Sequence, residues 1–164
     1  MTERLYIRLD EDPLYAPETS VPRGTLRDLR VPPELGLWVA HVVAYEEDVP
    51  AGEVARERVL PDGSMHLVFE FDGGSARSRV AGPRLRPSFL MMQGQVRGLS
   101  VKLRPGAAQA LFSASAHELA NDAVGWSDLV RARDRCVPDR LQEADSDRER
   151  LAVLTRALLG MRRD

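Results

Sequence analysis

The stretch VLPDGSMHLVFEF, which spans residues 59–71, carries the clearest structural signal in this chain. From residue 65 onward, apolar side chains occupy every second position, which is the period of a β-strand with one buried face. The Pro-Asp-Gly at 61–63 suits a tight turn, because Pro presets φ, Asp bonds nearby backbone and Gly accepts a positive φ. A second β-rich run at 54–60 precedes the turn. The stretch therefore predicts an antiparallel hairpin, in which the turn residues serve the fold rather than a chemical site.

Short apolar runs continue on both sides of this hairpin. Further strands are expected at 35–45, 75–81, 89–93 and 96–104. Turn residues separate the runs, among them Asp72-Gly73-Gly74 and Gly82-Pro83. Strands and turns that alternate roughly every ten residues are typical of an antiparallel β-barrel or sandwich, and not of a parallel sheet.

The character of the chain changes from strand to helix after the last of these runs. Pro105 stands where a helix can begin. Two later pairs, Ser115 with Glu118 and Ser146 with Glu149, have the spacing of an N-terminal capping box. The order of elements is therefore strands first and helices last.

The final helix, expected over about 147–161, has an apolar stripe on one side. Its members recur at spacings of three and four residues, and they are Leu151, Leu154, Leu158 and Met161. Such a stripe needs a cover. It either packs on the strands of its own chain or pairs with the same helix of a second copy around a two-fold axis.

These patterns divide the chain into three regions. Residues 1–34 are rich in proline and charge, so we expect an extended N-terminal arm there. Residues 35–104 hold the strands and residues 105–164 hold the helices, and the two regions are expected to form one compact domain. The expected fold class is α+β, with an antiparallel barrel or sandwich followed by a small C-terminal helical bundle.

Composition excludes several classes of protein. The formal net charge of −2 gives no general attraction to nucleic acid or to an anionic membrane. The single cysteine, Cys136, cannot form an internal disulfide. No apolar run approaches the ~20 residues that cross a membrane, and the charged N-terminus lacks the apolar core of a signal peptide. The expected location is the cytoplasm, with no membrane partner.

Patterns for catalysis and metal binding are missing from the sequence. The three histidines, His41, His66 and His117, include no His-x-His pair, whereas a cupin metal site takes two or three histidines and a carboxylate. There is no Gly-x-Ser-x-Gly elbow and no glycine-rich phosphate loop. We therefore expect no catalytic residue, no metal and no cofactor, and an enzyme is the less favoured class.

The interior of the predicted barrel is the natural place for a small-molecule effector. Aromatic and flexible methionine side chains can line an adaptable apolar pocket. The candidate lining residues are Trp38, Met65, Leu67, Phe69, Met92 and Val101. His41 and His66 are candidates for orienting a polar group of the ligand, and Arg104 for binding an anionic one. The alternative is a filled core with no cavity.

Two stretches of the sequence resemble a known family. Residues 59–69 and residues 98–108, GLSVKLRPGAA, are similar to the N-terminal domain of one branch of AraC-type bacterial transcription regulators. The likeness also includes the Pro-Pro at 32–33 before a Trp-containing strand, the Gly82-Pro83 break and the leucine-rich last helix, and it covers most of residues 31–160.

The resemblance implies a cupin-like β-region and C-terminal helices that support a homodimer. It also implies a paired helix-turn-helix module beyond Asp164, so DNA would be contacted through that module and not through these residues. On this basis the chain is expected to be an effector-sensing or dimerisation domain. Two alternatives stay open: a small cupin-type metal-dependent enzyme, and a protein-interaction module without a ligand.

Overall fold

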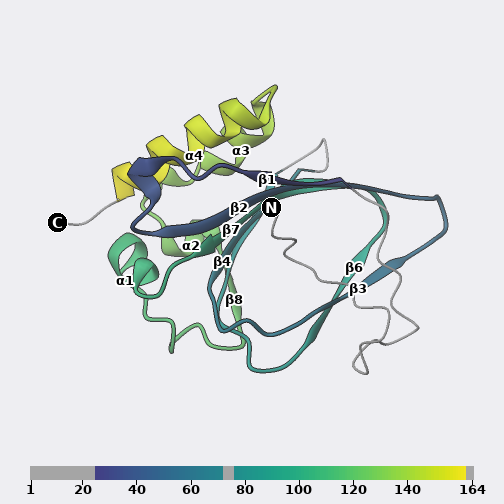
Figure 1. The fold of residues 1–164 in the computed structure, drawn as a ribbon, viewed down its shortest axis with the longest axis horizontal. Coiled ribbons are helices and arrows are strands. Elements are labelled where there is room, and N and C mark those ends of the chain that lie inside the picture. Colours follow the sequence, from purple (N-terminus) through teal and green to yellow (C-terminus); the bar gives the residue numbers. More distant parts are fainter. Residues whose placement is uncertain (1–24, 72–75, 162–164) are drawn as a thin grey trace.

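A computed structural model describes residues 25–71 and 76–161 of the chain (Figure 1). The strands are β1 (Thr25–Leu29), β2 (Val39–Val49), β3 (Ala55–Val59), β4 (His66–Phe71), β5 (Ala76–Ala81), β6 (Ser88–Met92), β7 (Gly94–Leu103) and β8 (Ala123–Gly125). The α-helices are α1 (Ala107–Phe112), α2 (Trp126–Leu129), α3 (Val137–Glu143) and α4 (Asp147–Met161). Two short 3-10 helices are η1 (Pro33–Leu35) and η2 (Ala132–Asp134). The predicted α+β class, with antiparallel strands, is confirmed.

The strands form two sheets instead of one closed barrel. The larger sheet has the order β1-β2-β7-β4-β5-β8, and all its neighbours are antiparallel. The smaller sheet is the antiparallel pair β3-β6. Figure 1 shows this pair on the side of the large sheet away from α3 and α4. Within the described ranges no strand pairing joins the two sheets, so the expectation of a closed barrel is corrected.

The hairpin predicted over 54–71 is also wrong. The run before the Pro-Asp-Gly turn becomes β3 and pairs with β6, whereas the run after it becomes β4 and pairs with both β5 and β7. Both edges of β4 are therefore occupied within the large sheet, which leaves β3 to find another partner. The turn expected at Asp72-Gly73-Gly74 lies outside the described residues.

The region predicted as an extended arm contributes to the fold. Residues 25–29 are extended, as predicted, but they form β1 and pair with β2 at the edge of the large sheet. A turn of 3-10 helix follows at Pro33, and the next strand begins at Val39, four residues later than the predicted start at 35. The arm's residues 1–24 lie outside the described part of the chain.

The core lies between the large sheet and the helices. Leu67, Leu99 and Val101 from adjacent central strands are fully buried, together with Leu141 and Leu158 from the helices. The alternation read from residues 65–71 therefore places the apolar set on a buried face. That face is covered by helices.

Trp126 anchors the helical layer to this face of the sheet. Its ring meets Phe69 edge-to-face at a centroid distance of 5.2 Å and Phe112 at 5.9 Å. Its indole N–H donates to the backbone oxygen of Asp134 at 2.9 Å, so the buried polar atom of the ring has a partner.

The stripe of α4 packs on its own chain. Leu154 and Leu158 are fully buried, Met161 is 4% exposed and Leu151 is half-buried against the same core. The first of the two covers expected for this stripe is therefore the one that the structure shows.

Arg150 joins α4 to the end of α3. Its guanidinium donates to the backbone oxygens of Leu141 and Ala144 at 3.2 and 2.8 Å, and to Asp147 at 3.1 Å. The capping interactions read from the sequence are also present: Ser146 accepts from the backbone N–H of Glu149, and Ser115 and Glu118 bond reciprocally. The second of these pairs caps a turn and not a regular helix.

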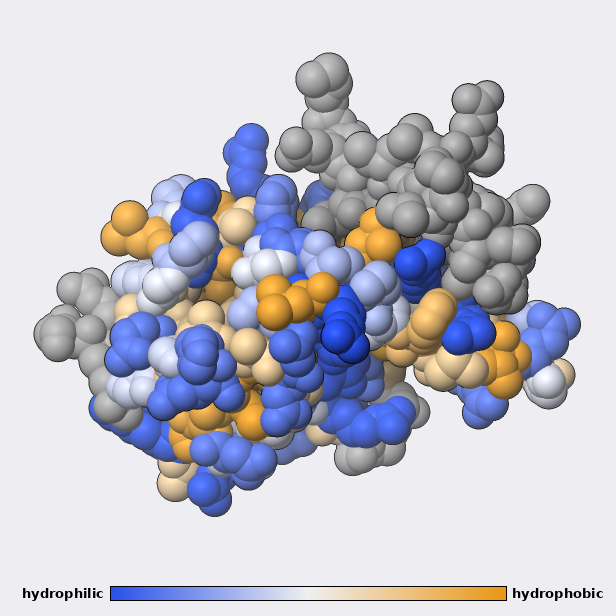
Figure 2. Space-filling model, turned by 90° about the horizontal axis from the view of Figure 1, so that it is seen from below, coloured by the Kyte–Doolittle hydropathy of each residue, from blue (hydrophilic) through white to orange (hydrophobic). Residues whose placement is uncertain are grey.

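The described surface mixes polar and apolar residues. Seen from below, apolar residues are interrupted by hydrophilic ones across the face in view (Figure 2). No helix in the described ranges is both long and apolar enough to cross a membrane.

Candidate functional site

The face of the large sheet opposite the helices carries a row of polar side chains. On three adjacent strands, Lys102 of β7 lies directly opposite His41 of β2 on one side and His66 of β4 on the other. Their strand neighbours Val42, Val101 and Leu67 belong to the core beneath the helices. Because successive side chains of a strand point to opposite faces, the three polar residues share the face opposite the helices.

A β-bulge brings His41 into this row. Val39 pairs with Leu103, but the next pair is His41 with Lys102, so Ala40 is an extra residue in β2. Without that extra residue, Ala40 would lie opposite Lys102 and His41 would turn toward the helices. From Ala40 onward, the residues of β2 that face the helices and those that face away are therefore exchanged.

Asp62 connects the Pro-Asp-Gly turn to the row. Its Oδ2 lies 2.9 Å from Nζ of Lys102 and 3.0 Å from Nε2 of His66. Its Oδ1 accepts the backbone N–H of Ser64 at 3.0 Å. We refer to Asp62, His66 and Lys102 as the Asp62 cluster.

The electrostatics of this cluster keep Asp62 ionised. Burial alone would raise the pKa of this carboxyl, but the hydrogen bonds from Lys102 and the Ser64 backbone, with the charge and hydrogen bond of His66, outweigh it. Together these effects lower the pKa of Asp62 to about 2. An ionised carboxylate only accepts hydrogen bonds, so Nε2 of His66 is the donor in that contact.

The cluster is suited to binding a group that accepts hydrogen bonds. Lys102 has three ammonium protons, and among the described residues the cluster's carboxylate takes one of them, which leaves two for a ligand. His41, exposed beside Lys102, adds a further donor or acceptor. In the described part of the chain, no group of three or more His, Cys, Asp or Glu residues is placed to hold a metal ion.

The eight pocket candidates are not brought together around one cavity. Met65, Leu67, Phe69 and Val101 are buried in the core between the sheet and the helices. Met92 lies in a separate small cluster with Val49 and Ala55, and Trp38 is half-buried against the main core. His41 and Arg104 are exposed. The helices cover the face on which four of the candidates lie, so these four belong to the core between the sheet and the helices.

Sequence reasoning missed the roles of Asp62 and Lys102. The Pro-Asp-Gly turn was interpreted as a fold determinant only, and no pattern placed its aspartate beside a strand forty residues away. One signal was available: Lys102 is the only lysine in a chain whose other strongly basic residues are all arginine.

A model of a protein family described as a domain of unknown function (DUF6597) matches residues 29–125. The match includes all of the Asp62 cluster and ends at the last residue of β8. No curated protein and no solved structure matches the chain.

Proposed function

We propose, from the premise that the chain belongs to the family of domains of unknown function DUF6597, that it is the sensing and dimerisation domain of an AraC-type transcription regulator. In this proposal a small-molecule effector binds at the Asp62 cluster, on the face of the large sheet opposite the helices. The helices on the opposite face join a second copy and lead to the DNA-binding module. The cupin-like character of the β-region belongs to the same proposal.

One observation carries the proposal. The resemblance to AraC-type regulators rests mainly on residues 59–69 and 98–108, which are far apart in the sequence. Asp62 comes from the first stretch and Lys102 from the second, and their charged atoms meet at 2.9 Å. Two stretches recognised for their sequence alone therefore contribute to a single polar site, as a shared binding function would require.

The surface proposed for dimerisation is the outer side of α3 and α4. The inner stripe of α4 is already used by the chain's own core, so a second copy would have to meet the opposite side. A surface groove of about 340 Å³ lies there, lined by Arg140, Glu143, Ala144, Glu149, Ala152, Val153 and Arg156. Its small apolar floor is flanked by two arginines and two glutamates. Such a surface is complementary to itself across a two-fold axis, where arginine of one copy can face glutamate of the other.

A reporter assay tests this function. The chain is fused to a DNA-binding module that represses a promoter only as a dimer, and repression is measured with and without a panel of small carboxylic acids. We expect the fusion to repress and at least one acid to change repression. Lys102→Met should remove the response to the acid while repression itself is retained.

Two results would contradict the proposal. If a stably folded fusion does not repress, the chain does not dimerise and the proposed dimerisation role is wrong. Stoichiometric iron, zinc or manganese in the purified protein would favour an enzyme of the cupin class instead.

A further inference from the structure

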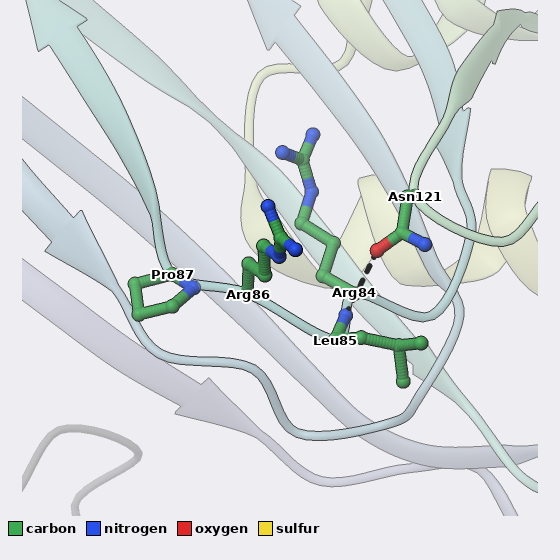
Figure 3. A pocket seen from close by; sticks show the side chains of 5 residues that line it. All are labelled: Arg84, Leu85, Arg86, Pro87 and Asn121. Carbon is green, nitrogen blue, oxygen red and sulfur yellow. Dashed lines mark hydrogen bonds between the residues drawn. The ribbon is translucent and has the colours of Figure 1, made fainter.

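A second polar site lies in the loop between β5 and β6. Here the surface forms a depression of about 490 Å³, lined by Arg84, Leu85, Arg86, Pro87 and Asn121 (Figure 3). The residues come from two segments that are distant in the sequence. None of them belongs to the Asp62 cluster, so a role for this depression does not depend on the proposed function.

The backbone at the start of the loop that carries the two arginines is hydrogen-bonded to Asn121 and Asp122. The N–H of Gly82 donates to the backbone oxygen of Asp122 at 2.9 Å, and the N–H of Asn121 donates to that of Pro83 at 2.9 Å. The N–H of Leu85 donates to Oδ1 of Asn121 at 3.0 Å.

Close packing at Gly82 fixes the start of this loop. A Cβ atom there would lie 1.7 Å from the backbone oxygen of Leu119, so the two segments approach to a distance that only glycine permits. The loop is therefore a fixed support for Arg84 and Arg86.

Both guanidinium groups are without a charged or hydrogen-bonding partner among the residues that the structure describes. Some other arginines in the described ranges do have carboxylate partners, such as Arg79 with Glu70 at 2.9 Å and Arg27 with Asp147 at 2.8 Å. Figure 3 shows the side chains of Arg84 and Arg86 projecting to the same side of the loop. Two like charges that project to the same side of a loop repel, and an anion bound by both would relieve that repulsion.

The lining also lacks a competing side-chain acceptor. None of the five lining residues is acidic. The one side-chain oxygen, Oδ1 of Asn121, already accepts the N–H of Leu85, and so the amide NH₂ is left as a donor. The side chains of the depression thus offer two positive charges and hydrogen-bond donors only.

We propose that this depression binds the phosphate group of a small phosphorylated molecule. Guanidinium groups are planar forks whose N–H donors match the oxygens of phosphate, and they stay charged at every pH of interest. A phosphate monoester carries close to two negative charges at neutral pH, which balances the two arginines. The exposed side chain of Leu85, together with Pro87, gives the organic part of the molecule an apolar surface to contact.

Titration of the whole purified chain with inorganic phosphate, followed by amide NMR at constant ionic strength, tests this proposal. We expect saturable shifts of the Leu85 and Asn121 amides. The double variant Arg84→Gln/Arg86→Gln should weaken phosphate binding at least about tenfold, because it removes both charge-assisted donors. Arg131→Gln/Arg148→Gln changes the net charge equally at two exposed positions elsewhere and should leave the binding unchanged. Dimethyl phosphate, which has one charge, should bind at least about tenfold more weakly than phosphate.

Three outcomes would overturn the proposal. Phosphate could produce no saturable shift, or both double variants could lose binding to the same extent, which would indicate a general charge effect. Equal binding of dimethyl phosphate and phosphate would show that a site for a dianion is the wrong description. Because both arginines are exposed or half-exposed and unpaired, the variants are expected to fold, and their amide spectra report this directly.

Discussion

At the scale of single residues, Asp62 connects local and long-range structure. Its Oδ1 closes the turn by accepting the N–H of Ser64, and its Oδ2 holds Lys102 and His66 on two neighbouring strands. One carboxylate thus fixes where the chain enters the large sheet. The same contacts hold the Lys102 ammonium on the face opposite the helices, where the proposed effector would bind.

The first prediction concerns this carboxylate. Asp62→Asn should lower the free energy of unfolding at pH 7 by about 1 kcal/mol, a modest figure because the group is partly exposed and its ion pair is screened by solvent. The pKa of Asp62 is lowered from its ordinary value of 3.8 to about 2 in the folded protein. A lowered pKa gives stability that is complete above pH 3.8 and is lost as the pH falls toward 2.

Urea denaturation of wild type and variant across this pH range checks that sign. The stability difference between the two proteins should shrink as the pH falls below 3.8. A difference that stays constant down to the lowest pH would show that the ionised carboxylate is not the source of the stability. Ser127→Ala, at an exposed position outside the cluster, is the control.

At the scale of elements, the sequence predicted strand content well and strand pairing poorly. The alternation at 65–71 identified β4 and its buried side correctly, because side-chain period is a local property. The predicted pairing of β3 with β4 was wrong. A sequence typical of a tight turn joins the two strands, and yet they belong to different sheets. β5 and β7 occupy both edges of β4, so β3 cannot pair with it. No local sequence pattern predicts that competition between strands.

The candidate site was likewise predicted only in part, because local patterns were recognised and long-range contacts were not. His41 and His66 were predicted as candidates for orienting a ligand, but the row that they form with Lys102 depends on a bulge at Ala40. A single extra residue reverses the faces of everything after it in β2, and an apolar run on both sides of the bulge conceals that reversal. The alternation correctly placed Met65, Leu67 and Phe69 on one buried face, whereas Met92 lies in a separate cluster. The sequence could not tell that helices cover the first face.

The second prediction tests where the stripe of α4 packs. Leu158 is fully buried and Leu159, the next residue, is 37% exposed. Leu158→Ala should therefore lower the free energy of unfolding by about 2–5 kcal/mol, whereas Leu159→Ala should change it by less than about 1 kcal/mol. Thermal or urea unfolding at two protein concentrations provides the measurement. If Leu158 instead packed against a second copy, its effect would depend on protein concentration, and this interpretation of the stripe would fail.

At the scale of the whole molecule, the large sheet is a single layer between two different environments. The Asp62 cluster lies on one face and α4 on the other. Arg27 of β1 crosses to the helical side, where Nε lies 2.8 Å from Oδ2 of Asp147 at the start of α4. Its hydrogen bond, with its charge, lowers the pKa of Asp147 despite burial. β1 pairs with β2, and β2 carries His41 next to the Asp62 cluster. A shift of β2 can therefore reach α4 through β1 and the Arg27–Asp147 ion pair.

The last prediction concerns how α4 would meet a second copy. If the groove on the outer side of α3 and α4 is the two-fold contact, charge reversal at its exposed edge must place like charges together across the axis. Arg156→Glu should therefore convert a dimer to a monomer, and Ala152→Glu, at an exposed position, should do the same by placing a carboxylate on the apolar floor of the groove. Arg131→Glu, at an exposed position outside the groove, should leave the dimer intact. Sedimentation or light scattering measures the mass, and thermal unfolding confirms that each variant is folded. A wild-type protein that stays monomeric at high concentration, or a dimer that withstands both groove variants, would assign the outer side of these helices to some other role; the packing of their inner side on the sheet would be unaffected.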